Sequence, residues 1–130
     1  MFYVGDILWL STRKDIDLLP EDFSGAARWN GEEANFLGLF FKRQSVYLTP
    51  GLLLWFKNGK LHRDKDSLDG PGPALMTTDG LQEWYREGEW HREDGPAVTQ
   101  HSTTGYATTY YWYYCGIYYG NGLDRPSNFP

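Results

Sequence analysis

Two histidines recur in the same local context, and both are candidates for a catalytic or metal-binding role. His62 and His91 each lie seven residues after a tryptophan, and each is followed by an arginine. A histidine at such a position could act as a general base or a metal ligand. Neither has a neighbouring Cys or the helical spacing of a zinc signature, so a structural role is favoured. We expect each His to stack on its Trp and to bond the Asp-Gly loop that follows.

The arginines after these histidines allow two interpretations. Arg63 and Arg92 could hold an anion, because the guanidinium fork matches carboxylates and phosphates. They could instead form local salt bridges, with Asp64, Asp94 or Glu83 as the nearest acids. The local salt bridges are the favoured interpretation.

The remaining polar candidates lack a catalytic pattern. Asp64, Asp66 and Asp69 resemble a calcium loop, but Lys65 interrupts them and no glutamate closes the loop. Cys115 sits in an expected tight turn without a cationic neighbour that would activate a thiol. We therefore expect no catalytic residue, no metal and no cofactor.

The histidines belong to a unit that occurs three times. The copies read WFKNGKLHR from Trp55, WYREGEWHR from Trp84 and WYYCGIYYG from Trp112. Gly-Pro-Ala follows the first two copies, at 72–74 and 95–97. A Gly four residues after each Trp, preceded by Asn in the first copy, predicts a β-hairpin in every copy. Glu87 and Cys115 replace that Asn, which leaves open a type I turn with a Gly bulge in the later copies.

A two-residue loop in each copy predicts specific cross-strand neighbours. In the second copy it places Trp84 opposite His91, Tyr85 opposite Trp90, Arg86 opposite Glu89 and Glu83 opposite Arg92. In the third copy it places Trp112 opposite Tyr119 and Tyr113 opposite Tyr118. The charge pairs have opposite signs, which adjacent strands prefer.

The elements that position these residues are expected to be strands. The chain has 130 residues with 18% aromatic side chains, a length that suits one domain and a composition that favours β-structure. We predict a single all-β domain, with three hairpin repeats at 50–130 arranged as an antiparallel meander. Residues 1–49 should form a β cap with strands near 2–4, 7–10, 36–42 and 46–49, and with either one short helix or a loop at 12–19.

The pattern Trp-[Phe/Tyr]-x-Asn-Gly-x-x-His-Arg followed by Asp-Gly-Pro-Ala resembles a MORN-like repeat of phage and large-virus type. The resemblance covers residues 50 to about 126, and it is strongest in Trp84–Ala97. It implies a rolled or elongated sheet that presents a surface to partners, with no catalytic role. Residues 1–49 show no resemblance to a known family.

Charge and composition limit the partners. The formal net charge is −5, which disfavours direct binding of nucleic acid, although the basic stretch Lys42, Arg43, Lys57, Lys60 and Arg63 keeps a phosphate track open. No apolar run is long enough for a membrane helix, the start has no signal-peptide pattern, and one cysteine fits a reducing compartment. We expect a cytoplasmic protein without membrane contact.

An uncharged aromatic stretch is the most unusual feature of the chain. Residues 106–119 hold eight aromatic side chains in fourteen positions, on both faces of an extended strand. The stretch is either a central strand covered on both sides or a strand with one binding face. The side chains predicted to contact a partner are Tyr106, Tyr110, Tyr111, Trp112, Tyr113 and Tyr118, followed by the acids Glu83, Glu87, Glu89, Glu93 and Asp94.

These observations predict a non-catalytic protein-binding module. By resemblance it is a small phage or viral accessory protein that inhibits a host or viral protein, and the acids suit a basic, nucleic-acid-binding partner. A self-associating assembly component, and hence a homo-oligomer, is the first alternative. Nucleic-acid contact through the basic stretch is the second.

Overall fold

A computed structural model describes residues 1–32, 34–40, 44–101 and 107–130 of the chain. The prediction of an all-β fold is confirmed: strands dominate, and the described part contains one short helix, α1 (Arg13–Asp17). None of the helical structure in that part has the length and apolar character needed to cross a bilayer.

The strands form one long sheet with two separate hairpins. Within the described residues the sheet has ten strands in the order β1-β2-β3-β6-β8-β9-β12-β13-β14, with β7 paired to β6. The sheet strands are β1 (Phe2–Val4), β2 (Ile7–Leu10), β3 (Gly25–Trp29), β6 (Leu53–Lys57), β7 (Lys60–Leu61), β8 (Leu75–Met76), β9 (Gln82–Glu83), β12 (Val98–His101), β13 (Thr108–Tyr114) and β14 (Ile117–Asn121). The separate hairpins are β4 (Ala34–Phe40) with β5 (Gln44–Leu48), and β10 (Tyr85–Arg86) with β11 (Glu89–Trp90).

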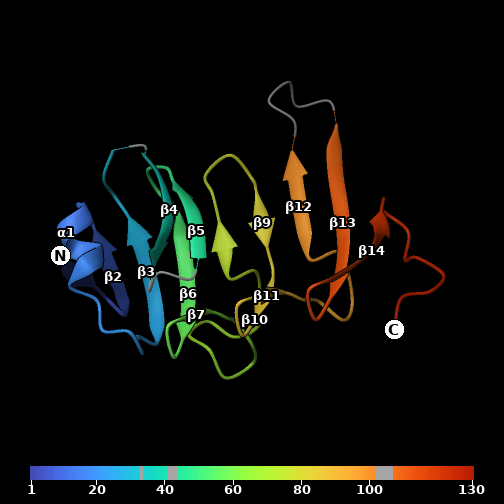
Figure 1. Cartoon of the computed structure of the whole chain (residues 1–130), viewed down its shortest axis with the longest axis horizontal. Helices are drawn as coiled ribbons and strands as arrows, with labels where there is room; N and C mark the ends of the chain where they lie inside the picture. Colours follow the sequence, from blue (N-terminus) through green and yellow to red (C-terminus); the bar gives the residue numbers. More distant parts are fainter. Residues whose placement is uncertain (33, 41–43, 102–106) are drawn as a thin grey trace.

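The sheet follows the chain from one end of the molecule to the other. Figure 1 shows the strands side by side along the long axis, with the N-terminus at one end and the C-terminus at the other. Every pair is antiparallel except β2 with β3, which is parallel. The strands of residues 50–130 pair only antiparallel, as expected for a meander, but the β10–β11 hairpin of the second copy forms a separate two-stranded sheet. Near the N-terminus, α1 provides the crossover that the parallel pair of β2 and β3 needs.

All three repeat hairpins have the same tight turn. The first central residue of each turn has a positive φ, 50° at Asn58, 49° at Glu87 and 48° at Cys115, and the Gly that follows does too. Positive φ at both central positions defines a type I′ turn. The alternative with a Gly bulge is thus wrong for the second and third copies.

The register agrees with most expected neighbours. Tyr85 pairs with Trp90, Arg86 with Glu89 and Tyr113 with Tyr118. In the third copy, however, the register shifts between Trp112 and Tyr113, so that Trp112 pairs with Gly120 instead of Tyr119. A β-bulge of this kind reverses the face of every residue beyond it.

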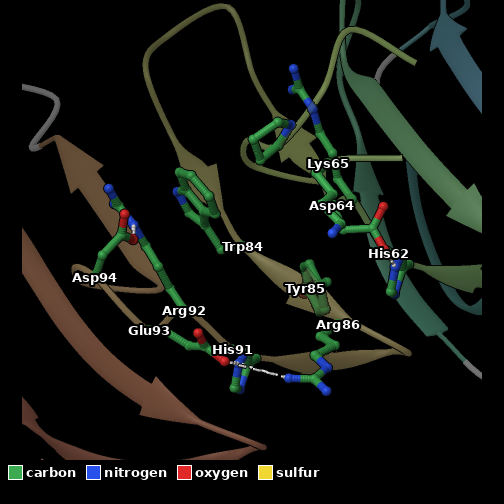
Figure 2. Close-up of a pocket in the computed structure, with 12 residues that line it drawn as sticks. His62, Asp64, Lys65, Trp84, Tyr85, Arg86, His91, Arg92, Glu93 and Asp94 are labelled. Atoms are coloured by element: carbon green, nitrogen blue, oxygen red, sulfur yellow. Dashed lines mark hydrogen bonds and ion pairs between the residues drawn. The ribbon is translucent and has the colours of Figure 1, made fainter. Parts of the chain in front are cut away.

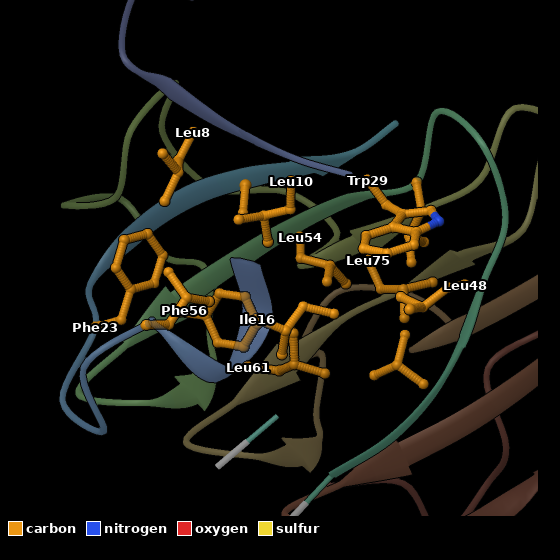
Figure 3. Close-up of a cluster of buried hydrophobic side chains, with 14 residues drawn as sticks. Leu8, Leu10, Ile16, Phe23, Trp29, Leu48, Leu54, Phe56, Leu61 and Leu75 are labelled. Carbon is orange, nitrogen blue, oxygen red and sulfur yellow. The ribbon is translucent and has the colours of Figure 1, made fainter. Parts of the chain in front are cut away.

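The N-terminal half of the sheet contains the larger hydrophobic core. Leu8, Leu10, Ile16, Trp29, Leu48, Leu54, Phe56, Leu61 and Leu75 are among its buried members, and Figure 3 shows them converging from several strands and α1. Thr12 caps α1, since its side chain accepts from the Asp15 N–H while the Asp15 carboxylate accepts from the Thr12 N–H. This N-cap at Thr12 stabilises the short helix α1, which places Ile16 in this core. Ile16 and Leu48 therefore pack in one core with Leu54 and Phe56 of the first repeat.

Candidate functional site

Each repeat histidine holds the turn of the next repeat. The backbone N–H of Glu87 donates to Nδ1 of His62, and that of Cys115 donates to Nδ1 of His91, both at 2.9 Å. The following glycines donate in the same manner, Gly88 to the Leu61 carbonyl and Gly116 to the Trp90 carbonyl. Both histidines are buried, whereas the residues that they hold, Glu87 and Cys115, are exposed, so these partly buried bonds join consecutive repeats.

In the turn of the first repeat, a serine takes the role that histidine has in the later repeats. The Asn58 N–H donates to Oγ of Ser24 at 2.9 Å, and the Gly59 N–H donates to the Phe23 carbonyl. Phe23-Ser24 therefore occupies the position that Leu61-His62 and Trp90-His91 occupy in later repeats. At the other end Tyr119 stands at the histidine position and its ring contacts Phe129. The described array thus begins with a serine and ends with an aromatic contact.

The tryptophans of the first two repeats are covered by arginines. The Arg63 guanidinium carbon lies 4.0 Å from the centroid of a Trp55 ring, and Arg92 is placed identically over Trp84. The expectation that histidines stack on these tryptophans is therefore wrong. The arginines do so, because their N–H groups reach the carbonyls of Pro73 and Pro96 in the Gly-Pro-Ala loops.

The expected arginine salt bridges are present in part. Arg92 pairs with Asp94 at 3.0 Å, whereas Arg63 donates to the Gly70 carbonyl. The expected pair of Glu83 with Arg92 is wrong, because the Arg92 backbone leaves the hairpin and its N–H donates to the Tyr113 carbonyl.

A hollow of about 550 Å³ lies between the loops of the first two repeats, and both histidines line it (Figure 2). His62 Nδ1 accepts from Glu87, and its Nε2 lies 2.8 Å from Asp64 Oδ2, so both nitrogens are engaged. His91 Nε2 lies 3.5 Å from Glu93, and Arg86 also pairs with Glu93. The bond from His62 holds the pKa of Asp64 below its ordinary value. These contacts give both histidines and Asp64 a structural partner, which does not favour proton transfer by these groups.

The part of the chain that the structure describes contains no group of three or more His, Cys, Asp or Glu side chains that could hold a metal ion. The Asp64 loop has a structural arrangement of its own. Asp64 Oδ1 accepts from the Asp66 N–H at 2.9 Å, while Oδ2 contacts His62. The carboxylate therefore folds its own loop.

One face of the sheet changes from core to open surface along the array. Residues that pair directly across antiparallel strands share a face. One such row runs through Ala27, Leu54, Leu75, Glu83, Val98 and Tyr111. Ala27, Leu54 and Leu75 are buried in the main core, while Tyr111 is half-buried. Val98 is also buried, so the row is partly open at Glu83 and Tyr111, which sequence alternation alone could not show.

The open half of that face holds a groove of about 350 Å³ with aromatic walls. Trp90, Tyr111 and Tyr113 line it, together with Leu81, Gln100 and Glu83. The rings form a continuous chain, with centroids 4.8 Å apart for Trp90 and Tyr113 and 5.3 Å apart for Tyr113 and Tyr118. Tyr118 is 51% exposed, so the chain of rings continues onto the free edge strand.

Glu83 lies in this groove with its charge largely desolvated. Its Oε1 accepts from the Trp90 indole N–H at 2.7 Å and from the Tyr85 hydroxyl at 3.1 Å. Burial raises the pKa of Glu83 above its ordinary value, although the two hydrogen bonds oppose the shift. Burial and the neighbouring carboxylate also raise the pKa of Tyr85, so its hydroxyl stays a donor.

The structure separates the residues predicted to contact a partner. Tyr111, Tyr113, Tyr118 and Glu83 share the open aromatic face, and Tyr106 lies outside the described residues. Trp112 is 5% exposed on the other face, where it packs against Phe129 and donates to the Gly122 carbonyl, and Tyr110 shares that face. Glu93 and Asp94 line the inter-repeat hollow, while Glu87 and Glu89 lie at the β10–β11 turn beside Lys60 and Arg86.

The basic stretch is also divided. Lys42 and Arg43 lie outside the described residues, Lys57 pairs across the first hairpin with Lys60, and Arg63 is stacked on Trp55. Two exposed lysines therefore remain from the expected phosphate track.

The sequence does not predict two features of the site. The bonds from histidine to the next turn join residues 24 or 25 positions apart, and only the period of 28 to 29 residues hints at them. The two-residue loop predicts Glu83 opposite Arg92, and that pairing gives no indication of the bond from Trp90 to Glu83.

Comparison of the chain with family models, with curated proteins and with solved structures gave no match. The resemblance to a MORN-like repeat therefore stays a prediction, and the repeat itself rests on the contacts described above.

Proposed function

We propose that this chain is a non-catalytic protein-binding module whose contact surface is the open aromatic face of β12, β13 and β14. The observation that carries the proposal is the row of residues that is core around Leu54 and Leu75 and half-open at Tyr111. Tyr and Trp are the residues most enriched at binding hot spots, because they combine a large apolar area with a polar tip.

The position of the histidines supports a role without catalysis. A general base needs a nitrogen that is free to take a proton from a substrate. His62 uses both nitrogens in contacts that hold the next turn and the Asp64 loop. The finer proposal is an accessory protein of phage or viral type that inhibits its partner in the cytoplasm, and it rests on the resemblance alone.

The proposal is tested by comparing partner capture by matched tyrosine variants. Tyr118 and Tyr47 are each 51% exposed, but only Tyr118 lies on the aromatic face. A protein captured by the wild type should be lost with a Tyr111→Ser/Tyr118→Ala double variant and retained with Tyr47→Ala. Isothermal titration with the identified, purified partner should show at least a tenfold weaker Kd for the double variant. Equal affinity for all three proteins would refute this choice of surface.

A second candidate function is self-association through the two ends of the sheet. Both edge strands are uncharged and exposed: Phe2 is 56%, Tyr3 62% and Ile117 58% accessible. Proteins normally protect such edges with charge or proline. Pairing of β14 with β1 of a second copy would give an open head-to-tail array. Sedimentation velocity over a wide concentration range tests it, and a monomer at every concentration rules it out.

A further inference from the structure

The Glu83 carboxylate is largely desolvated, and a desolvated negative charge needs a hydrogen-bond donor or a cation nearby to stabilise it. Its side chain lines the aromatic groove, and its two hydrogen bonds both reach Oε1. Oε2 has no hydrogen-bond partner among the residues that the structure describes. The same residues place no Lys or Arg in the lining of the groove. A largely desolvated charge without a counterion is unfavourable, so the site favours either a proton or an external cation.

The walls of the groove suit a cation as well. Trp90 and Tyr113 lie beside Glu83, and Tyr111 continues the wall. Aromatic faces attract ammonium and guanidinium groups through their quadrupole, and Trp does so most strongly. The indole N–H of Trp90 donates to Glu83, so the carboxylate also fixes the orientation of this ring.

The size of the groove favours a single side chain. Its volume of about 350 Å³ is at the small end for ligand pockets, and it opens on a flat sheet face. An anion would face Glu83 directly, and a purely apolar group would leave Oε2 without a partner. A long basic side chain can place its stem on the rings and its charge on the carboxylate.

We propose that the Glu83 groove receives an arginine or lysine side chain of a protein partner, held between the Glu83 carboxylate and the rings of Trp90, Tyr111 and Tyr113. This inference rests on the proposed function, because it assumes that the aromatic face contacts a protein. It adds that the partner presents a basic residue to the centre of that face. The upward shift of the Glu83 pKa fits a carboxylate whose counterion is supplied only on binding.

The experiment uses N-acetyl-argininamide as the probe and the Trp90 indole N–H resonance as the readout, assigned with a Trp90→Phe variant. N-acetyl-citrullinamide, which has nearly the same shape without the charge, is the ligand control. In the wild type at pH 7.5 the arginine probe should shift the resonance saturably, and the citrulline probe should not. Equal shifts from both probes would overturn the proposal.

The variants separate charge from shape. Glu83→Gln keeps an oxygen that accepts from Trp90 but removes the charge, so binding of the arginine probe should weaken at least tenfold. Glu21→Gln changes an exposed glutamate in the N-terminal cap, and binding should stay unchanged. Wild-type binding should also weaken at low pH, where Glu83 is protonated. Unchanged affinity in Glu83→Gln would overturn the proposal.

Failure of this inference differs from failure of the proposed function. If an identified partner loses affinity with Tyr111→Ser/Tyr118→Ala but keeps full affinity for Glu83→Gln, the aromatic face is the interface and the cation pocket is refuted. If the arginine probe binds as expected but the tyrosine variant keeps its partner, the pocket exists and the interface lies elsewhere.

Discussion

Nδ1 of His62 accepts a hydrogen bond from the backbone N–H of Glu87, 25 residues later in the chain. The repeat at His91 and Cys115 has the same 2.9 Å bond. The N–H that is held in each case belongs to a non-glycine residue with positive φ. Each repeat therefore stabilises a backbone conformation that the next repeat would otherwise adopt at a cost.

Removal of this bond should destabilise the chain. His62→Ala leaves the Glu87 N–H without its acceptor. Because this bond is only partly buried and Glu87 is exposed, the cost should be about 1 kcal/mol, at the low end for an unsatisfied donor. Urea unfolding should show that loss, and hydrogen exchange should show faster exchange of the Glu87 amide.

The matched control for His62 is His101→Ala. His101 is exposed and its Nδ1 contacts Thr108 Oγ1 within the β12–β13 pair, so its loss should change stability by less than the loss of His62. If the Glu87 amide exchanges at the same rate in wild type and His62→Ala, the bond does not hold the turn.

A substitution at Glu87 should stabilise the β10–β11 turn. Glu87 has φ of 49°, a region where most L-residues are strained and where Asn is tolerated. Glu87→Asn copies the Asn58-Gly59 turn and keeps the N–H that His62 requires, so it should stabilise the protein by about 0.5–1 kcal/mol. Thermal unfolding measures it, with Glu89→Asn in the adjacent strand as a control that should not stabilise. A lower Tm for Glu87→Asn would contradict the turn geometry.

The part of the fold that follows from local pattern was predictable from sequence. The Trp-to-Gly spacing identifies all three hairpins, and the apolar runs on either side of Gly5-Asp6 identify β1 and β2. Turn type at Glu87 and Cys115 was not predictable, because local propensity disfavours positive φ there. A histidine from the preceding repeat overrides that propensity, and such a contact is non-local.

The sequence predicts which strand carries the candidate site, but it does not predict which face of that strand is open. The aromatic run identifies β13, and it includes Tyr111 and Tyr113 of the groove. The sequence predicts Trp112 as a contact residue together with these tyrosines, but the structure buries it against Phe129. Phe129 lies 17 residues from Trp112, in a tail without periodicity, so no pattern in the sequence pointed to this contact.

The pH dependence of stability should reveal Glu83. Its pKa is raised in the folded state from an ordinary value of 4.5, so the folded state binds the proton more tightly than the unfolded chain. The stability due to this group is then fully present below pH 4.5 and is lost as pH rises through the folded pKa. Asp64 and Asp15, whose pKa values are lowered, act in the opposite direction.

The contribution of Glu83 is isolated by comparison with Glu83→Gln. Since Gln can still accept from Trp90 and Tyr85, the variant should become more stable relative to wild type as pH rises from 4 to 8. Chemical denaturation at several pH values measures the difference. A difference that is constant over this range would show that Glu83 is not desolvated in the fold.

Phe129 should act as the cap of the last repeat. Its ring is 7% exposed and packs against Trp112, Tyr114 and Tyr119, with centroid distances of 5.1, 5.9 and 5.4 Å. Replacement of a buried Phe by Ala typically costs about 3–5 kcal/mol, and the lower end applies in a segment without helix or strand, which can relax. Because contacts in a repeat array are mainly between neighbours, Phe129→Ala should loosen β13 and β14 before the N-terminal core. Hydrogen exchange should then show faster exchange in 108–121 and unchanged exchange in β2 and β3.

The control is Leu123→Ala, at a residue 71% exposed in the same tail, which should leave exchange in both regions unchanged. Uniform destabilisation of all strands by Phe129→Ala would mean that the sheet unfolds as one cooperative unit, and that the tail supports the whole of it.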